Sequence, residues 1–504
     1  MLEQTVKKIL NAKVYDAAIE TPLEPAAFLS RRMNNQILIK REDLQSVFSF
    51  KLRGAYNKMT TLTQEQLDKG VICASAGNHA QGLAEAARLM GVKATIVMPK
   101  TTPDIKVANV RARGGKAVLV GDSFDEALAH AQKLEQEKGL TFIHPFDDPD
   151  IIAGQGTVAR EILHQHTGAP IDAVFIPVGG GGLAAGMAAY IKYLQPQIKV
   201  IGVEFEESAC LAAAMKAGKR VTLDQVGIFA DGIAVAQIGK HSWKICKDHI
   251  DEVITVTSDE ICAAVKDIFD DTRSITEPAG ATSVAGMKKF VAREGWEGKT
   301  LVTISSGANT NFDRLRYIAE RAEVGEHREA ILSVTIPERP GAFKQFISII
   351  GKRAVTEFNY RYADDKEAKI FVGVRISSNE ERQELVQALR DADHPVLDLT
   401  DNEVAKSHIR HMVGGHAPHI TDERLYRFEF PERPGALGKF LTTLGGNWNI
   451  SLFHYRNHGA AYGRVLAGIQ VPKAELKEFR TKLDDLGYPY WDESENPVYS
   501  VFLG

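Results

Sequence analysis

Short apolar runs alternate with longer amphipathic stretches from Val71 to Glu204. Runs of four to seven residues rich in valine, isoleucine and alanine are typical of buried strands, and apolar residues every three or four positions are typical of helices. The pattern predicts strands at 71–74, 94–98, 117–120, 173–178, 199–203 and 301–304, and helices at 78–90, 104–113, 124–137 and from Leu183. This alternation predicts a wound α/β fold with a mostly parallel sheet.

The pattern changes near residue 325, where an internal repeat begins. The heptapeptide P-E-R-P-G-A-F at 337–343 returns as P-E-R-P-G-A-L at 431–437. Each copy predicts the order β-α-β-β-α-β, which is a ferredoxin-like α+β unit. The predicted domains are therefore 1–325, 329–400 and 423–504, with a linker at 401–422.

Composition limits the possible partners and the location. The 504 residues are 44% hydrophobic and 25% charged, as in ordinary globular proteins, and the net charge of -4 predicts no nucleic-acid or membrane partner. The N-terminus lacks a basic start followed by an apolar run, so we expect no export signal and a cytoplasmic protein.

The cysteines and linker histidines do not form a recognisable metal-binding pattern. The four cysteines contain no C-x-x-C pair, which argues against a zinc site or a disulfide framework. Four histidines lie in the glycine-containing linker without a cysteine, so we predict solvated side chains and no metal there: His408, His411, His416 and His419.

Four consecutive glycines, Gly179 to Gly182, stand between an apolar strand and a helix. Backbone N–H groups in such a loop, with the N-terminus of the next helix, bind phosphate. The uncharged stretch 173–191 is long enough for a membrane span, but its glycines and proline favour a strand, loop and helix. G-x-G-x-x-A at 180–185 with Glu204 also fits a dinucleotide site, so this segment alone supports a phosphorylated cofactor and a dinucleotide equally.

Three other segments contain candidate chemistry. Lys51 in S-F-K-L-R-G-A suits a Schiff-base lysine or a surface lysine with a buried stem, and Arg53 is assigned no role. The segment S-A-G-N-H-A-Q-G at 75–82 exposes N–H groups that can hold a carboxylate, although Asn78 also suits a helix cap. Ser306 follows a strand, where a turn serine is the simplest interpretation.

Together, these segments resemble the fold-type II pyridoxal-phosphate enzymes, most closely the biosynthetic threonine dehydratases, over essentially the whole chain. The resemblance implies pyridoxal 5'-phosphate as cofactor and makes the dinucleotide interpretation a minor one. The implied cofactor-binding residues are Lys51, which would bind it covalently, Phe50 beside it, Asn78 at the ring hydroxyl, Ser306 at the ring nitrogen, and Gly179, Gly180, Gly181, Gly182 and Leu183 at the phosphate. The implied substrate-binding residues are Ser75, Ala76, Gly77, Asn78 and His79.

The same resemblance implies conversion of L-threonine to 2-oxobutanoate and ammonia, the first committed step of isoleucine biosynthesis. The repeats resemble ACT-like regulatory domains, which implies isoleucine as inhibitor, valine as opposing activator and a homotetramer. Tyr360 and Tyr455 occupy matching places in the two copies and are candidate effector contacts. Two alternatives stay open: a serine dehydratase, racemase or β-replacement enzyme with the same cofactor, and an amino-acid sensor with a vestigial catalytic domain.

Overall fold

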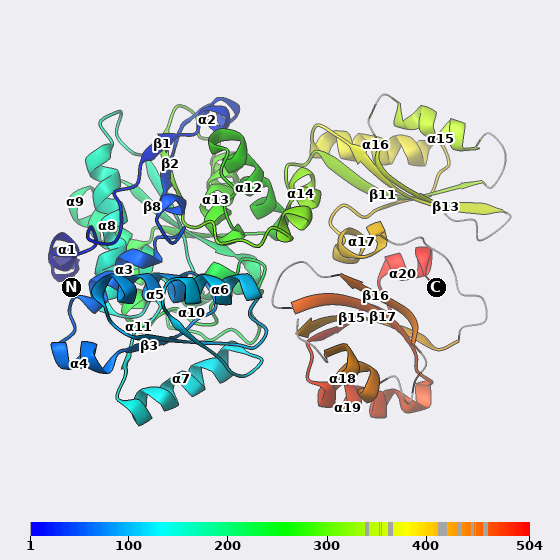
Figure 1. Ribbon diagram of the computed structural model, residues 1–504. Helices are drawn as coiled ribbons and strands as arrows, with labels where there is room; N and C mark the ends of the chain where they lie inside the picture. Colours follow the sequence, from blue (N-terminus) through cyan, green and yellow to red (C-terminus); the bar gives the residue numbers. More distant parts are fainter. Residues whose placement is uncertain are drawn as a thin grey trace. The chain divides into compact units, whose positions relative to one another are not determined.

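The computed structural model describes residues 2–337, 342–351, 353, 355–360, 366–411, 421–431, 436–444, 448, 450–456 and 462–503. The chain forms two compact units, Met1–Phe312 and Asp313–Gly504 (Figure 1). This division precedes the boundary predicted at residue 325, because helix α14 (Arg314–Gly325) packs on strand β11 (Glu329–Pro337) of the second unit.

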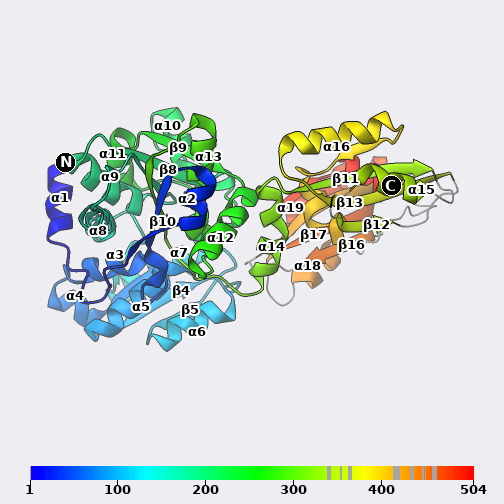
Figure 2. The ribbon, with the colours of Figure 1, turned by 90° about the horizontal axis from the view of Figure 1, so that it is seen from above.

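The larger sheet of the first unit has six strands in the order β1-β2-β10-β7-β8-β9. Every neighbouring pair is parallel except β1 and β2, so the prediction of a mostly parallel sheet is confirmed. Figure 2 shows helices α8 and α9 on one side of this sheet and α12 and α13 on the other. The elements are β1 (Leu23–Pro25), β2 (Gln36–Arg41), β7 (Ala173–Pro177), β8 (Lys199–Phe205), β9 (Glu252–Val256), β10 (Thr300–Ser305), α8 (Pro149–Gln165), α9 (Gly182–Leu194), α12 (Ser258–Thr272) and α13 (Pro278–Glu294).

A second, smaller parallel sheet in the same unit has the order β5-β4-β3-β6. Helix α7 covers one face, and α5 and α6 cover the other (Figure 1). The elements are β3 (Val71–Ala74), β4 (Ala94–Met98), β5 (Lys116–Leu119), β6 (Thr141–Phe142), α5 (Asn78–Met90), α6 (Asp104–Ala112) and α7 (Phe124–Lys138). Apolar runs along the chain predict strands but do not say which strands share a sheet.

The predicted elements of this unit form, with ends shifted by at most two residues. Local chemistry explains several of these ends. Ser123 and Glu126 form a capping box at the start of α7, and Gly139 ends that helix in the left-handed conformation. All five residues of β7 are buried, as expected for a parallel strand covered on both faces. Among helices within the described ranges, none combines the length and the apolar character that a membrane span needs.

The second unit contains the two predicted ferredoxin-like copies. Their antiparallel sheets have the matching orders β12-β13-β11-β14 and β16-β17-β15-β18, which confirms the order β-α-β-β-α-β. The elements not yet given are β12 (Val355–Tyr360), β13 (Glu367–Arg375), β14 (Val396–Asp398), β15 (Glu423–Pro431), β16 (Ile450–Arg456), β17 (Tyr462–Gln470), β18 (Tyr490–Asp492), α15 (Ala342–Ile350), α16 (Asn379–Asp391), α18 (Ala436–Thr443) and α19 (Leu476–Leu486).

The two copies pack together through an apolar cluster. Phe371 of the first copy and Leu466 of the second lie in it, with residues of α17 (Glu403–Ser407) and α20 (Pro497–Phe502). Figure 1 shows α17 and α20 at the faces of the two sheets that lie opposite to the faces covered by α16 in the first copy and α19 in the second. Each copy also has an apolar core of its own, around Phe346 in the first and Phe440 in the second, so the shared cluster joins two units that each bury a core.

The segment predicted as a linker contains α17, and one histidine in it departs from the prediction. His408 is fully buried, so the expectation of a solvated side chain is wrong there. His411 lies 3.6 Å from the carboxylate of Glu320, and His416 and His419 lie outside the described residues. Within the described part of the chain, no group of three or more metal-ligating side chains is arranged to hold a metal ion.

Candidate active site

One pocket of the first unit gathers most of the residues predicted to bind the cofactor. It is a cleft that is partly open to solvent. It is lined by Phe50, Lys51, Asn78, Phe146, Pro177, Gly179, Gly180, Gly181, Gly182, Leu183, Gly232, Ile233, Val235, Glu277, Ala279 and Ser306. Three segments far apart in the sequence, around residues 51, 180 and 306, therefore meet at one site.

The glycine loop occupies one side of this pocket, between β7 and α9. Gly181 has φ +85°, a backbone conformation that other residues rarely adopt, and it precedes the first residue of α9. A Cβ on Gly180 would lie 2.2 Å from the Phe146 ring, and one on Gly179 would lie 2.8 Å from the backbone of Ile233. The loop has room for backbone only, which leaves its N–H groups and the N-terminus of α9 available to an anion.

Gly180→Ala is expected to weaken anion binding in this loop. The added methyl group must displace the Phe146 ring, and overpacking of this kind costs about 1–3 kcal/mol, equivalent to an increase of about five- to a hundredfold in the Kd of a phosphorylated ligand. Titration with pyridoxal phosphate, followed by protein fluorescence, measures this change. Gly168→Ala is the control, because Gly168 is exposed and the nearest atom to an added Cβ is at the end of the His166 side chain, 3.1 Å away. An unchanged Kd for Gly180→Ala would contradict the assignment of the loop.

Lys51 is the first residue of α3 (Lys51–Met59), and its side chain lines the pocket. Its Nζ donates to the carbonyl oxygen of Pro145 at 3.0 Å. Burial disfavours the charged ammonium and lowers the pKa of Lys51 from 10.5 to about 8, and the nearby Glu277 carboxylate only partly offsets this shift. A lysine with this pKa has a substantial fraction of nucleophilic amine near neutral pH, which favours the Schiff-base interpretation over a surface lysine.

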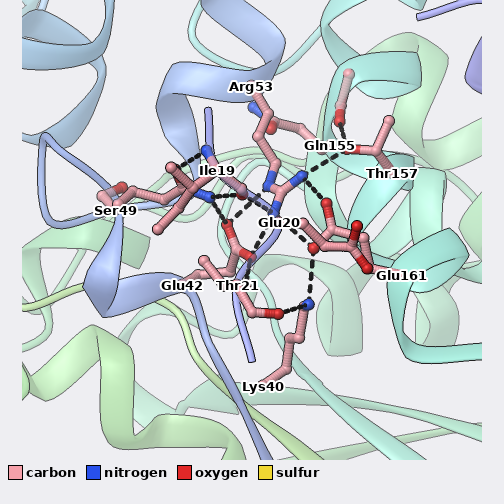
Figure 3. Close-up of polar contacts among 12 residues, drawn as sticks. Ile19, Glu20, Thr21, Lys40, Glu42, Ser49, Arg53, Gln155, Thr157 and Glu161 are labelled. Carbon is pink, nitrogen blue, oxygen red and sulfur yellow. Dashed lines mark hydrogen bonds and ion pairs between the residues drawn. The ribbon is translucent and has the colours of Figure 1, made fainter. Parts of the chain in front are cut away.

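A buried charge network anchors the helix that carries Lys51. The Arg53 guanidinium donates to Glu42 (both bonds 2.8 Å) and to Glu161, and Lys40 pairs with Glu161 at 2.7 Å (Figure 3). Arg53 and Glu42 are fully buried. Burial alone would raise the pKa of Glu42, but the charge of Arg53 outweighs it and holds that pKa below its usual value. Arg53, assigned no role from the sequence, therefore fixes α3 to α8 and to the turn that begins at Glu42, directly after β2.

The segment before Lys51 is bonded to the loop that carries Ser306. Phe50 N–H donates to the Ser306 carbonyl at 3.3 Å, and Ser49 forms an antiparallel bridge with Gly307. Ser306 itself is buried, with its hydroxyl 3.4 Å from the carbonyl oxygen of Ala279 on α13. Ser306 is therefore a pocket residue rather than a solvated turn serine.

Asn78 does not cap its own helix. It is the first residue of α5, Gly77 precedes the helix without a side-chain cap, and the Asn78 amide bonds two distant residues instead. Its Nδ2 donates to Glu277 Oε1 at 2.6 Å, and its Oδ1 accepts from Asn309 Nδ2 at 2.7 Å. The Asn78 amide is thus held at the pocket that the family resemblance implies for the cofactor.

Part of the predicted carboxylate-binding segment is already bonded within the protein. Ser75 N–H donates to Val97 O in the β-sheet, and Gly77 N–H is 3.3 Å from the Ser75 hydroxyl. The His79 side chain is buried against the carbonyl of Ile143, and burial lowers its pKa to about 3. Ser75, Ala76, Gly77 and His79 are not among the residues that line the pocket. The N–H groups of the first turn of α5 are the donors that can reach a substrate carboxylate, and the role of the whole segment in substrate binding stays a prediction.

Glu204 was the candidate ribose-binding acid if the glycine loop bound a dinucleotide. In the structure it has a structural role instead. Its carboxylate accepts from the N–H groups of Leu211 and Ala212, both at 2.8 Å, at the start of α10 (Cys210–Ala217). Burial raises the pKa of Glu204 to about 7. Because both oxygens already bind backbone donors, Glu204 is not available to a ribose.

Glu277 and the loop 143–147 were not predicted from the sequence to be site residues, and Asn309, in the segment S-G-A-N at 306–309, was assigned no role. Glu277 precedes Pro278, and proline at the first position of a helix is a recognisable signal, but nothing in the sequence places Glu277 beside Asn78. Phe146 and Pro145 lie in an irregular loop whose position depends on both Lys51 and the glycine loop.

Family models match two parts of this chain. The model described as "Pyridoxal-phosphate dependent enzyme" matches residues 14–307, and "C-terminal regulatory domain of Threonine dehydratase" matches 320–409 and 414–503. Among curated proteins, biosynthetic L-threonine dehydratase IlvA of Burkholderia multivorans is 58% identical over 501 residues, covering 99% of both chains. The protein of that name from Escherichia coli is 56% identical, covering 99% of this chain and 96% of that one.

Solved structures resemble the chain over about two thirds of its length. The processed form of threonine deaminase isoform 2 from Solanum lycopersicum has a TM-score of 0.62 and 50% identity, covering 64% of this chain and 93% of that one. Serine racemase from Dictyostelium discoideum has a TM-score of 0.56 and 31% identity, covering 61% and 99%.

Proposed function

This chain belongs to the pyridoxal-phosphate-dependent enzymes and, within them, to the biosynthetic threonine dehydratases, and on that premise we propose that it converts L-threonine to 2-oxobutanoate and ammonia. The observation that carries the proposal is the convergence of Lys51, Asn78, Ser306 and the glycine loop on one pocket. In a vestigial catalytic domain we would expect at least one of these four features to be lost or to lie outside the pocket.

The pocket fits pyridoxal phosphate on structural grounds. A Cβ would fill the space between the glycine loop and Phe146, so the loop suits close approach of a phosphate. Lys51 has a lowered pKa suited to covalent attachment, and Asn78 and Ser306 provide polar groups for a ring. We assign Gly179 to Leu183 to the phosphate, Lys51 and Phe50 to the aldehyde end, Asn78 to the ring hydroxyl and Ser306 to the ring nitrogen.

Pyridoxal phosphate, when bound, supplies an electron-withdrawing ring that disperses the negative charge developing at the substrate Cα. Lys51 would hold the cofactor covalently, and its Nζ, when free, would accept the Cα proton of the substrate. The N–H groups at the start of α5 bind the substrate carboxylate and orient the Cα–H bond toward Nζ. The β-hydroxyl and the proton removed from Cα together make up the water that is lost. The released enamine then tautomerises and takes up one water, which gives 2-oxobutanoate and ammonia.

Ser306 bears on which reaction follows proton removal. A neutral hydroxyl does not stabilise a charged pyridinium as a carboxylate does, so Ser306 would favour a neutral ring nitrogen in the bound cofactor. A neutral ring withdraws electrons less strongly, which favours rapid loss of the β-hydroxyl over transamination.

We propose that the C-terminal unit binds isoleucine as inhibitor and valine as opposing activator. The support is the doubled unit and its match to a threonine dehydratase regulatory domain. Tyr360 lies opposite Ile370, and Tyr455 lies opposite Val465, so the two tyrosines hold the same register position in edge strands β12 and β16. Their side chains lie outside the described residues, and their contact with effectors stays a prediction.

We also propose a homotetramer in the cytoplasm. The edge strands β12 and β16 offer backbone groups that a second subunit can pair with. Four buried cysteines form no disulfide, as expected in a reducing compartment: Cys73, Cys210, Cys246 and Cys262.

The proposed function is tested with the purified protein, pyridoxal phosphate and either L-threonine or L-serine. We expect threonine to perturb the visible absorbance of the bound cofactor and to yield 2-oxobutanoate and ammonia in equal amounts. Isoleucine should suppress this turnover, and valine should relieve the suppression. Turnover of serine without turnover of threonine would instead support the serine-specific alternative. A colourless protein that still binds isoleucine would support the sensor alternative.

A further inference from the structure

Glu277 is the one carboxylate among the described residues that line the catalytic pocket, and the reaction outlined above does not use it. Only 3% of its surface is exposed. Burial of a charged group is costly unless it is paired or hydrogen-bonded, so its presence in the pocket calls for a role.

The position of Glu277 is fixed by the loop that carries Ser306. Its backbone N–H donates to the Gly307 carbonyl at 3.1 Å, and the neighbouring Thr276 hydroxyl donates to the same carbonyl at 2.6 Å. A Cβ on Gly307 would lie 2.5 Å from Glu277 Oε1, and one on Gly232 would lie 3.2 Å from it. Two glycines thus leave just enough room for the carboxylate.

The carboxylate determines how the Asn78 amide is oriented. Asn78 presents its Nδ2 to Glu277 Oε1, which accepts the hydrogen bond at 2.6 Å. The oxygen of the same amide supports this orientation. Asn309 Nδ2 donates to Val47 O at 2.8 Å and to Asn78 Oδ1 at 2.7 Å, so Oδ1 is the accepting end of Asn78. One of the two Asn78 N–H bonds is therefore engaged with Glu277, and the second is left for a ligand.

We infer that Glu277 is a positioning residue for the cofactor: by accepting from Asn78 Nδ2, it holds the Asn78 amide so that its second N–H can bond the ring hydroxyl. This inference rests on the proposed cofactor. Because Glu277 is also bonded to the Ser306–Gly307 loop, one residue links the groups expected at the ring oxygen and at the ring nitrogen.

The test compares two variants that change different properties of Glu277. Glu277→Gln keeps the length and an accepting oxygen but removes the charge, whereas Glu277→Asp keeps the charge but is one methylene too short for the 2.6 Å contact. We expect the Kd of pyridoxal phosphate to rise about ten- to a hundredfold in the aspartate variant and less than about fivefold in the glutamine variant. The visible spectrum of the bound cofactor should shift only in the aspartate variant. Glu260→Asp, in the capping box of α12, is the matched control and should leave both unchanged.

A double-variant cycle separates this role from a direct electrostatic effect on Lys51. If Glu277 acts through Asn78, adding Glu277→Asp to Asn78→Ala should change the Kd by no more than about twofold. Three results would overturn the inference: an aspartate variant that binds like the parent, a glutamine variant as weak as the aspartate variant, or an aspartate effect that persists in Asn78→Ala. If Glu277→Asp fails to fold, Asn309→Ala takes its place in the cycle, because it releases the other end of the same amide.

Cofactor binding and the visible spectrum of the parent protein show whether a negative result contradicts the role of Glu277 or the proposed function. Failure of the parent protein to bind pyridoxal phosphate would contradict the proposed cofactor before any variant is made. A parent that binds the cofactor but does not convert threonine would contradict the proposed reaction and leave the role of Glu277 open to the same binding test.

Discussion

Lys51→Ala is expected to lower kcat on threonine at least about a thousandfold, because one change removes both the covalent attachment and the proton acceptor. The visible absorbance of the lysine-bound cofactor should disappear at the same time. Lys51→Arg should behave in the same way, because a guanidinium keeps the charge but is not a nucleophile. The control is Lys58→Ala on the same helix, which removes an ion pair with Asp148 outside the pocket and should keep the absorbance. Turnover by Lys51→Ala at the parent rate would refute the assignment.

The lowered pKa of Lys51 also predicts how cofactor loading depends on pH. The neutral amine is the form that reacts, and its fraction rises with pH until the pKa is passed. Because that pKa is about 8, the loading rate of cofactor-free protein should rise tenfold per pH unit below it and level off above it. Stopped-flow absorbance measures this rate. A rate still rising at the ordinary lysine pKa of 10.5 would show that burial does not activate Lys51.

Arg53→Met is expected to lower the free energy of unfolding by about 3–5 kcal/mol, because Glu42 and Glu161 would remain buried without their shared partner. Methionine fills much of the space, so the loss measures the unpaired charge more than a cavity. Urea unfolding followed by circular dichroism gives the change. Arg293→Met is the matched control, since Arg293 is half-exposed and pairs with the partly exposed Glu252 and Glu294, and it should cost less than about 1 kcal/mol. Equal losses for the two variants would show that the network contributes little.

Local sequence was sufficient for most elements of the first unit. The strand at 71–74 and the helix at 78–90 have the predicted ends, because burial of a continuous apolar run and a glycine at the end of an amphipathic stretch are local signals. The division of the strands between two sheets was not predicted. Sheet membership depends on pairing between distant strands, such as β10 with β2.

The same limit applies to the active site. Lys51 and the glycine loop could be identified because each carries its chemistry within a few residues. Glu277 and Arg53 could not, since their partners lie 199 and 108 positions away in the sequence. Ser75 was overestimated as a backbone donor because its N–H is used by the sheet, which only the strand pairing reveals.

The buried thiols make the two units distinguishable to a labelling reagent. Every cysteine lies in the first unit, and burial raises the pKa of Cys73, Cys210 and Cys246, so the folded unit offers almost no thiolate. A thiol-specific reagent added to the intact chain therefore reacts only when the catalytic unit opens. Its rate reports the opening of that unit alone, while the cysteine-free regulatory unit stays silent.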